Sequence, residues 1–115
     1  MQLWAWESVR KELLNDKLWR KVVSGEKAMV AQLGLSKGCV VPMHHHESEQ
    51  ISVVLHGALR FELEGREVMV RGGEVLLIPS NVPHSALAVE DTAGIDVFSP
   101  IRHDWLEGTD DYLRK

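Results

Sequence analysis

Glycine-containing turn signals recur at short intervals through the middle of this chain and separate short apolar runs. They are Ser24-Gly25, Lys37-Gly38, His56-Gly57, Glu64-Gly65 and Gly72-Gly73. Short runs with strand propensity between such turns are typical of an all-β sandwich or barrel. A chain of 115 residues has room for one such domain and no second core.

The runs predict strands at about 19–23, 28–35, 40–42, 51–56, 58–63, 66–71, 75–78, 84–89 and 94–98. The two-residue loop Glu64-Gly65 predicts a tight antiparallel hairpin between strands 58–63 and 66–71. Segments 51–55 and 75–78 are apolar on both faces, so we expect the barrel interior on one side and a covering layer on the other. A second copy of the chain can supply that layer, and we therefore predict a homodimer.

We divide the chain into an N-terminal arm (1–17), a barrel (18–102) and a C-terminal turn and tail (103–115). The arm contains Trp4 and Trp6 in a mixed pattern that fits either a short amphipathic helix or an arm packed on the partner subunit. After the barrel we expect one helical turn near 104–106 and then a polar tail.

Charge and composition exclude several classes of protein. The formal net charge is −4 and lysine and arginine form no stripe, which argues against a nucleic-acid partner. Nor does the composition fit a transmembrane chain. The N-terminus lacks the features of a signal peptide, and Cys39 is the single cysteine, so we expect a cytoplasmic protein.

Three consecutive histidines, His44 to His46, are the main candidate for a functional site. In an extended segment the side chains of His44 and His46 point to the same face, and His45 points away. Gln50 follows where a short turn can return its amide oxygen to the same point. His84 comes from a separate strand, after the stiff segment between Pro79 and Pro83.

Imidazole nitrogens are good ligands for Zn, Ni, Fe, Mn or Co. A histidine run is also compatible with a solvated polar loop, and a lone histidine after a proline turn is more often a packed side chain. It is the combination of His84 with the first segment that favours a metal site. We therefore expect one divalent transition metal ion per subunit.

The histidine segment resembles the first motif of the cupin superfamily, G-x5-H-x-H-x3,4-E-x6-G. The matching positions are Gly38, His44, His46, Gln50 and Gly57. The later segment resembles the second motif, G-x5-P-x-G-x2-H-x3-N. Gly73, Pro79 and His84 match it, whereas Asn81 stands at the motif's second glycine and Ala88 at its final asparagine. The resemblance implies a cupin fold, which is a jelly-roll-like double-stranded β-helix barrel with the metal inside.

One departure from the general motif lies at a ligand position, because Gln50 stands where the motif has glutamate. An amide oxygen still coordinates a metal, but it leaves the charge of the dication uncompensated. The ion is then held less tightly and is a stronger electrophile toward an anionic ligand.

Residues near the end of the barrel point to a narrower resemblance. Asp96 and Phe98 share one face of the last strand, and Arg102 follows it. A carboxylate beside an aromatic ring on this face fits a catalytic wall of the metal-lined cavity. The strand pattern alone is also compatible with core packing for Phe98 and with a turn or salt bridge for Asp96. Together with the histidines and Gln50, however, these residues resemble the KdgF-type cupins of pectin and alginate breakdown.

That resemblance implies His44, His46, Gln50 and His84 as the metal ligands. It implies conversion of 4,5-unsaturated monouronates to linear 4-deoxy-5-keto uronates, by ring opening and ketonisation. In this hypothesis Asp96 transfers the proton, Arg102 grips the carboxylate in a bidentate manner, and Phe98 shapes the sugar-binding wall.

Other functions fit the same metal site. One is an enzyme acting on a different acidic metabolite, including an oxygen-dependent dioxygenase. The other is a cupin that binds a ligand without catalysis. Fold alone does not separate them, because one fold hosts many chemistries.

Overall fold

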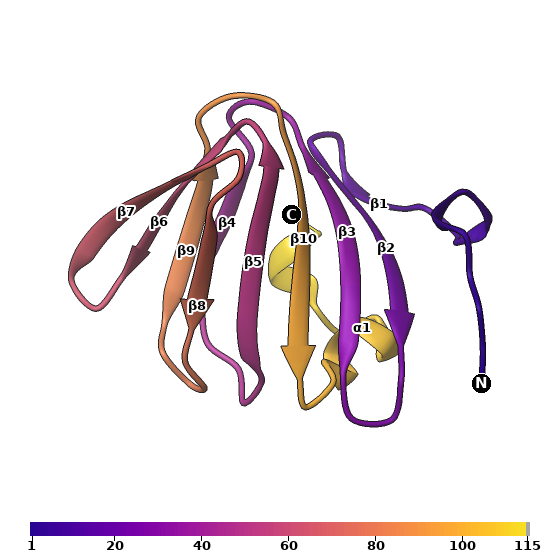
Figure 1. Cartoon of the computed structure of the whole chain (residues 1–115). Coiled ribbons are helices and arrows are strands. Elements are labelled where there is room, and N and C mark those ends of the chain that lie inside the picture. The colour runs from indigo at the N-terminus through magenta and orange to yellow at the C-terminus, as the bar shows by residue number, and fades with distance from the viewer. Residues whose placement is uncertain (115) are drawn as a thin grey trace.

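The computed structural model describes residues 1–114 and consists mainly of two antiparallel sheets (Figure 1). The six-stranded sheet has the order β1-β2-β3-β10-β5-β8, and the four-stranded sheet has the order β4-β9-β6-β7. The strands are β1 (Glu12–Asn15), β2 (Leu18–Ser24), β3 (Met29–Leu35), β4 (Val40–His44), β5 (Glu49–His56), β6 (Ala58–Leu63), β7 (Arg66–Arg71), β8 (Val75–Ile78), β9 (His84–Ala88) and β10 (Thr92–Ser99). The helical elements are η1 (Trp6–Ser8), α1 (His103–Glu107) and η2 (Asp111–Leu113). Within residues 1–114, no helix is long and apolar enough to cross a membrane.

The predicted hairpin is present as β6 and β7, which pair from Ala58↔Arg71 to Leu63↔Arg66. Its two loop residues, Glu64 and Gly65, have φ values of 53° and 72°. A two-residue loop with positive φ at both positions matches the twist of the flanking strands. The all-β architecture that the turn spacing predicts is thus confirmed.

The core lies between the two sheets and takes side chains from both. On β5 the inward positions are Gln50, Ser52 and Val54, and all three are buried. The alternate residues Ile51 and Leu55 point outward and are exposed. We expected a covering layer on this strand, supplied by a second copy of the chain, and among residues 1–114 no element covers its outer face.

The N-terminal segment contributes a strand that the sequence pattern did not indicate. β1 pairs with β2 through Leu13↔Trp19 and buries Leu14 in the core. Residues before β1 lead away from the sheets (Figure 1), and the side chains of Leu3 and Trp4 are exposed. The sheet therefore begins inside the segment that we expected to be an arm, while its first residues do extend outward.

The C-terminal segment, residues 103–114, packs against the barrel. The expected helical turn is α1, but the expectation of a polar tail after it is wrong for Asp110 and Leu113, which are buried. The segment joins edge strands of both sheets. The Asn15 side chain on β1 donates to the Leu113 carbonyl, and the Tyr112 ring stacks on His44 of β4. Residues 103–114 thus bridge the two sheets beside the histidines.

Candidate metal centre

His44, His46 and His84 converge on one point. His44 ends β4 and His84 begins β9, and these two residues are direct partners in the antiparallel pairing. Their ring centroids are 4.3 Å apart. His46 follows in the loop after β4, and one ligand atom from each of the three rings lies within 4.8 Å of the others. His45 is exposed, as the alternation of an extended segment predicts.

All three histidines are oriented by a hydrogen bond to a backbone carbonyl. In each case Nδ1 lies 2.8 Å from the oxygen, and the carbonyls belong to Pro42, Ser48 and Val82. A carbonyl oxygen only accepts, so Nδ1 carries the proton and Nε2 presents a lone pair. This tautomer is the one that binds a metal through Nε2.

Burial keeps these imidazoles neutral. It lowers the pKa of His44 and His46 to about 4, although the carbonyl hydrogen bonds oppose the shift. Burial also lowers the pKa of His84. The Nε2 atom of His84 is buried and has no hydrogen-bond partner among residues 1–114. A buried nitrogen lone pair without a partner is costly, and a metal ion would satisfy it.

Gln50 completes a set of four possible ligands. Its amide nitrogen donates to Ser52 Oγ at 2.8 Å and to Asp96 Oδ2 at 3.4 Å, so its oxygen faces the histidines. Gln50 Oε1 lies 3.1 Å from His46 Nε2. With Nδ1 of His46 protonated, both of these atoms are acceptors. Two acceptors this close disfavour each other unless a cation lies between them, so Gln50 and the three histidines form a donor set suited to a single small cation.

Asp96 is half-buried and lies beside Gln50. It is on β10, directly opposite Ser52 of β5. Burial raises the pKa of Asp96 to about 6, while a hydrogen bond from Ser52 and the positive charge of Arg102 oppose the shift. A carboxyl group with such a pKa can take up and release a proton near neutral pH.

Arg102 and Phe98 lie on the same side of the cavity. Phe98 is fully buried, with its ring edge-on to His46 and to Trp105. The Arg102 guanidinium lies 5.3 Å from the centroid of the Phe98 ring. Its Nε and Nη2 donate to the Asp104 carboxylate at 3.0 and 2.8 Å. We expected Arg102 to grip a substrate carboxylate in a bidentate manner, but Asp104 takes up Nε and Nη2 in this way, which leaves Nη1 for a ligand.

Sequence reasoning missed three contributors to the site: Ser52, Trp105 and Tyr112. The Ser52 hydroxyl accepts a hydrogen bond from the Gln50 amide, and Ser52 pairs with Asp96 across β5 and β10. Trp105 and Tyr112 line the same cavity as His44, Gln50 and His84, together with apolar side chains of both sheets. The available signal was the presence of two aromatic residues in a segment that otherwise reads as a polar tail.

Comparison with known proteins identifies the class of this fold and site. The family model described as "Cupin domain" matches residues 32–98. This chain belongs to the cupin family, as its two motifs and its histidine cluster predicted.

Relatives within the family are more specific. The chain is 29% identical to the pectin degradation protein KdgF of Dickeya dadantii over 98 residues, which is 83% of this chain and 89% of that protein. The structure of KdgF from a Halomonas species superimposes with a TM-score of 0.84 at 30% identity, covering 91% of this chain and 98% of that one. An RmlC-like cupin from Shewanella frigidimarina gives a TM-score of 0.81 at 26% identity, covering 86% and 90%. The chain is a cupin of the KdgF type.

Proposed function

We propose that this protein catalyses the metal-dependent ring opening and ketonisation of 4,5-unsaturated monouronates to linear 4-deoxy-5-keto uronates. One observation carries the proposal: a cluster of three histidines, His44, His46 and His84, lies with the Gln50 oxygen at a cavity that Asp96 and Arg102 also line. Similarity to KdgF proteins over most of the chain supports a sugar acid as the substrate.

One divalent transition metal ion per subunit belongs to this proposal. Its ligands would be His44, His46, Gln50 and His84. The ion would supply positive charge to stabilise the oxygen anion that develops on ring opening. The ligand set is neutral, so this charge is available to an anionic substrate.

Asp96 is the proposed proton carrier. Its carboxylate removes the proton of the C1 hydroxyl, and the bond between C1 and the ring oxygen breaks to give an aldehyde at C1. The electron pair of that bond stays on the ring oxygen, which becomes an enolate on C5. Asp96 then delivers the proton to C4, so C5 becomes a ketone and the product is an isomer of the substrate.

Arg102 and Phe98 are the proposed binding residues. The hydrogen bonds to Asp104 use Nε and Nη2 of Arg102, so Nη1 is the atom proposed to hold the C6 carboxylate. Phe98 lies beside Arg102, and its buried ring packs against both His46 and Trp105. This places the C6 carboxylate and the C5 oxygen of the substrate in the same part of the cavity. Negative charge develops on the C5 oxygen during ring opening.

The absorbance of freshly prepared 4,5-unsaturated galacturonate tests this function, because ketonisation destroys the conjugated enoate. We expect the metal-loaded protein to accelerate the loss of absorbance above the spontaneous rate, and the metal-stripped protein to lose that acceleration. Asp96→Asn is expected to abolish turnover while metal content stays at the wild-type level. Absence of acceleration by the fully metal-loaded protein would refute the uronate assignment.

We further propose that two copies of the chain form a homodimer through the outer face of β5 and β8. Within one chain β5 and β8 are paired strands, with Ile51 opposite Leu77 and Val53 opposite Val75. Leu77 and Val75 are 53% and 61% exposed, although they are large apolar side chains. β8 is also an edge strand of its sheet. An apolar face of this kind on an edge is usually covered in a stable assembly.

A cytoplasmic location is part of the proposal as well. The single cysteine, Cys39, is free and buried. Burial raises the pKa of its thiol, which keeps it in the unreactive protonated form. A chain without a disulfide is compatible with a reducing compartment.

A further inference from the structure

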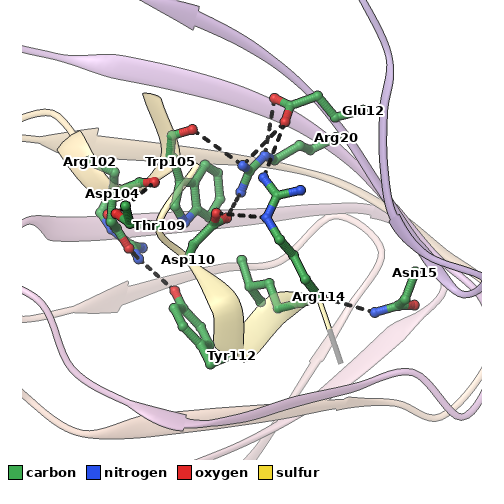
Figure 2. A network of polar contacts seen from close by, with 11 residues as sticks. Glu12, Asn15, Arg20, Arg102, Asp104, Trp105, Thr109, Asp110, Tyr112 and Arg114 are labelled. Carbon is green, nitrogen blue, oxygen red and sulfur yellow. Dashed lines mark hydrogen bonds and ion pairs between the residues drawn. The ribbon is translucent and has the colours of Figure 1, made fainter. Parts of the chain in front are cut away.

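Tyr112 occupies a position between the metal ligands and the arginine. It is part of η2 in the C-terminal segment, and its ring stacks on that of His44 with centroids 4.5 Å apart and an interplanar angle of 30°. Its hydroxyl oxygen lies 2.5 Å from Arg102 Nη2 (Figure 2). Both contacts place the phenol on the wall of the cavity that holds the candidate ligands.

The hydrogen bond to Arg102 leaves the phenolic proton of Tyr112 uncommitted. A guanidinium has only donors, so in this contact the Tyr112 oxygen must accept. Its own O–H group is therefore left to donate, and no acceptor for it is found among residues 1–114. A donor next to a guanidinium is well suited to an anionic oxygen, because both groups attract the same ligand.

The phenol is held in place from both sides. Before it, the buried Asp110 is paired with Arg20 and Arg114. After it, Leu113 is buried, and its carbonyl accepts a hydrogen bond from Asn15 Nδ2 at 3.0 Å. Because its neighbours are anchored, Tyr112 presents its hydroxyl with little loss of side-chain entropy when a ligand binds.

A second unpaired donor lies on the same wall. Trp105 is 7% exposed, and its Nε1 has no hydrogen-bond partner among residues 1–114. Its ring packs against both Arg20 and Arg102, at 4.3 and 4.9 Å from the guanidinium carbons (Figure 2). An unsatisfied buried donor calls for an explanation, and a ligand rich in oxygen atoms supplies one. Trp105 and Tyr112, both from the C-terminal segment, thus line the cavity beside the metal ligands.

We propose that Tyr112 is a ligand-binding residue of this cavity, and that its hydroxyl donates a hydrogen bond to an oxygen of a carboxylate-bearing ligand held by Arg102. The identification of that ligand as a uronate rests on the proposed function, but the role of Tyr112 does not. The C-terminal segment then forms part of the binding site.

Tyr112 is the single tyrosine of the sequence, which allows a direct test. Protein labelled with ζ-13C tyrosine gives one phenol carbon resonance. The labelled, zinc-loaded protein is titrated with acetate and, separately, with D-galacturonate. We expect saturable movement of the tyrosine resonance with at least one of these carboxylates, and no movement with galactose, which lacks the carboxylate. An unmoved resonance with both carboxylates would overturn the proposal.

Tyr112→Phe gives an independent measurement, because it keeps the stacked ring and removes only the O–H donor. For the carboxylate that moves the tyrosine resonance, we expect the calorimetric dissociation constant to rise about tenfold, the effect of one hydrogen bond. Zinc affinity should be unchanged. Asp111→Asn, an exposed neighbour, is the matched control and should bind like the wild type. Unchanged affinity for that carboxylate in Tyr112→Phe would overturn the proposal.

The outcomes for Tyr112 and for the uronate reaction are separable. A tyrosine resonance that moves with acetate, in a protein that does not accelerate uronate ketonisation, supports Tyr112 and refutes the proposed function. Conversely, accelerated ketonisation with the same KM in Tyr112→Phe, and an unmoved resonance, supports the proposed function and refutes the role of Tyr112. The resonance is measured on the wild-type protein, so it still decides the role of Tyr112 if the Tyr112→Phe variant fails to fold.

Discussion

Arg20 on β2 and Asp110 in the C-terminal segment form an ion pair in which neither side chain is exposed to solvent. Arg20 Nη1 lies 2.5 Å from Asp110 Oδ2, with both side chains 0% exposed (Figure 2). Arg114 bonds the other carboxylate oxygen at 3.1 Å, and Glu12 on β1 pairs with both arginines. Opposite charges therefore balance inside the structure, and the C-terminal segment is joined to the first strands of the barrel.

Breaking this pair on one side should be costly. We expect Arg20→Met to lower the free energy of unfolding by about 3–5 kcal/mol, because Asp110 is left buried without its main partner. The double variant Arg20→Met with Asp110→Leu should recover part of that loss, since no single charge remains. Denaturant unfolding of the wild type, both single variants and the double variant measures the coupling. Simple additivity of the single effects would contradict the interpretation.

Zinc should stabilise the folded protein through the histidine cluster. A ligand that binds only the folded state, at one hundred times its dissociation constant, adds about 2.7 kcal/mol of stability. His84→Ala removes one of three converging nitrogens and should abolish the rise in Tm on adding zinc. His45→Ala changes an exposed neighbour and serves as the control. An equal rise in both variants, seen by differential scanning calorimetry, would argue against a site at these residues.

Gln50→Glu should change metal affinity and apoprotein stability in opposite directions. The new carboxylate adds a negative charge beside the dication, so zinc affinity should increase at least about tenfold in competition with a chelator. Without metal, the same carboxylate faces Asp96 where the amide nitrogen lay 3.4 Å away, and like charges disfavour the folded state. Gln50→Leu, which removes the ligand atom, should weaken zinc binding. A weaker affinity in Gln50→Glu would speak against coordination by residue 50.

The pair formed by Arg102 and Asp104 should make stability depend on pH. Burial acts to raise the pKa of Asp104, but hydrogen bonding and the charge of Arg102 outweigh it and hold the pKa below its ordinary value of 3.8. The resulting stability is present above the ordinary carboxyl pKa, and it is lost as the pH falls through the lower, folded value. Asp104→Asn should therefore be less stable than the wild type at pH 7, and the difference should shrink toward pH 3.

Glu107→Gln is the matched control for this effect, because Glu107 lies on the same helix and is exposed. Its unfolding free energy should follow that of the wild type across the same pH series. A difference between Asp104→Asn and the wild type that is constant with pH would exclude the ion pair as its cause.

The outer face of β5 and β8 should control the oligomeric state. The wild type is expected to be a dimer in sedimentation or light scattering, and Leu77→Asp, which places a charge in the apolar face, is expected to be a monomer. Leu106→Asp is the control, because Leu106 is exposed to a similar degree, 52%, but lies on α1. A wild-type monomer, or a Leu77→Asp dimer, would rule out this interface.

Much of the barrel follows from local patterns. The two-residue loop at Glu64 and Gly65 specifies its hairpin through backbone conformation alone. Alternation along an extended chain separates His45 from His44 and His46 without any long-range contact. The strand Glu12–Asn15 was missed because its short, mixed pattern becomes a strand only through pairing with β2.

By itself, the sequence determined the all-β class, the cupin family and the residues that converge as possible metal ligands, because turn chemistry, side-chain alternation and motif spacing are local properties. Only the tertiary structure decided where the C-terminal segment packs and which residues it contacts. Arg20 and Asp110 are 90 residues apart, and burial of their charges depends on each meeting the other. The same packing brings Tyr112 onto His44 and Arg102, a contact between segments whose proximity no local pattern encodes.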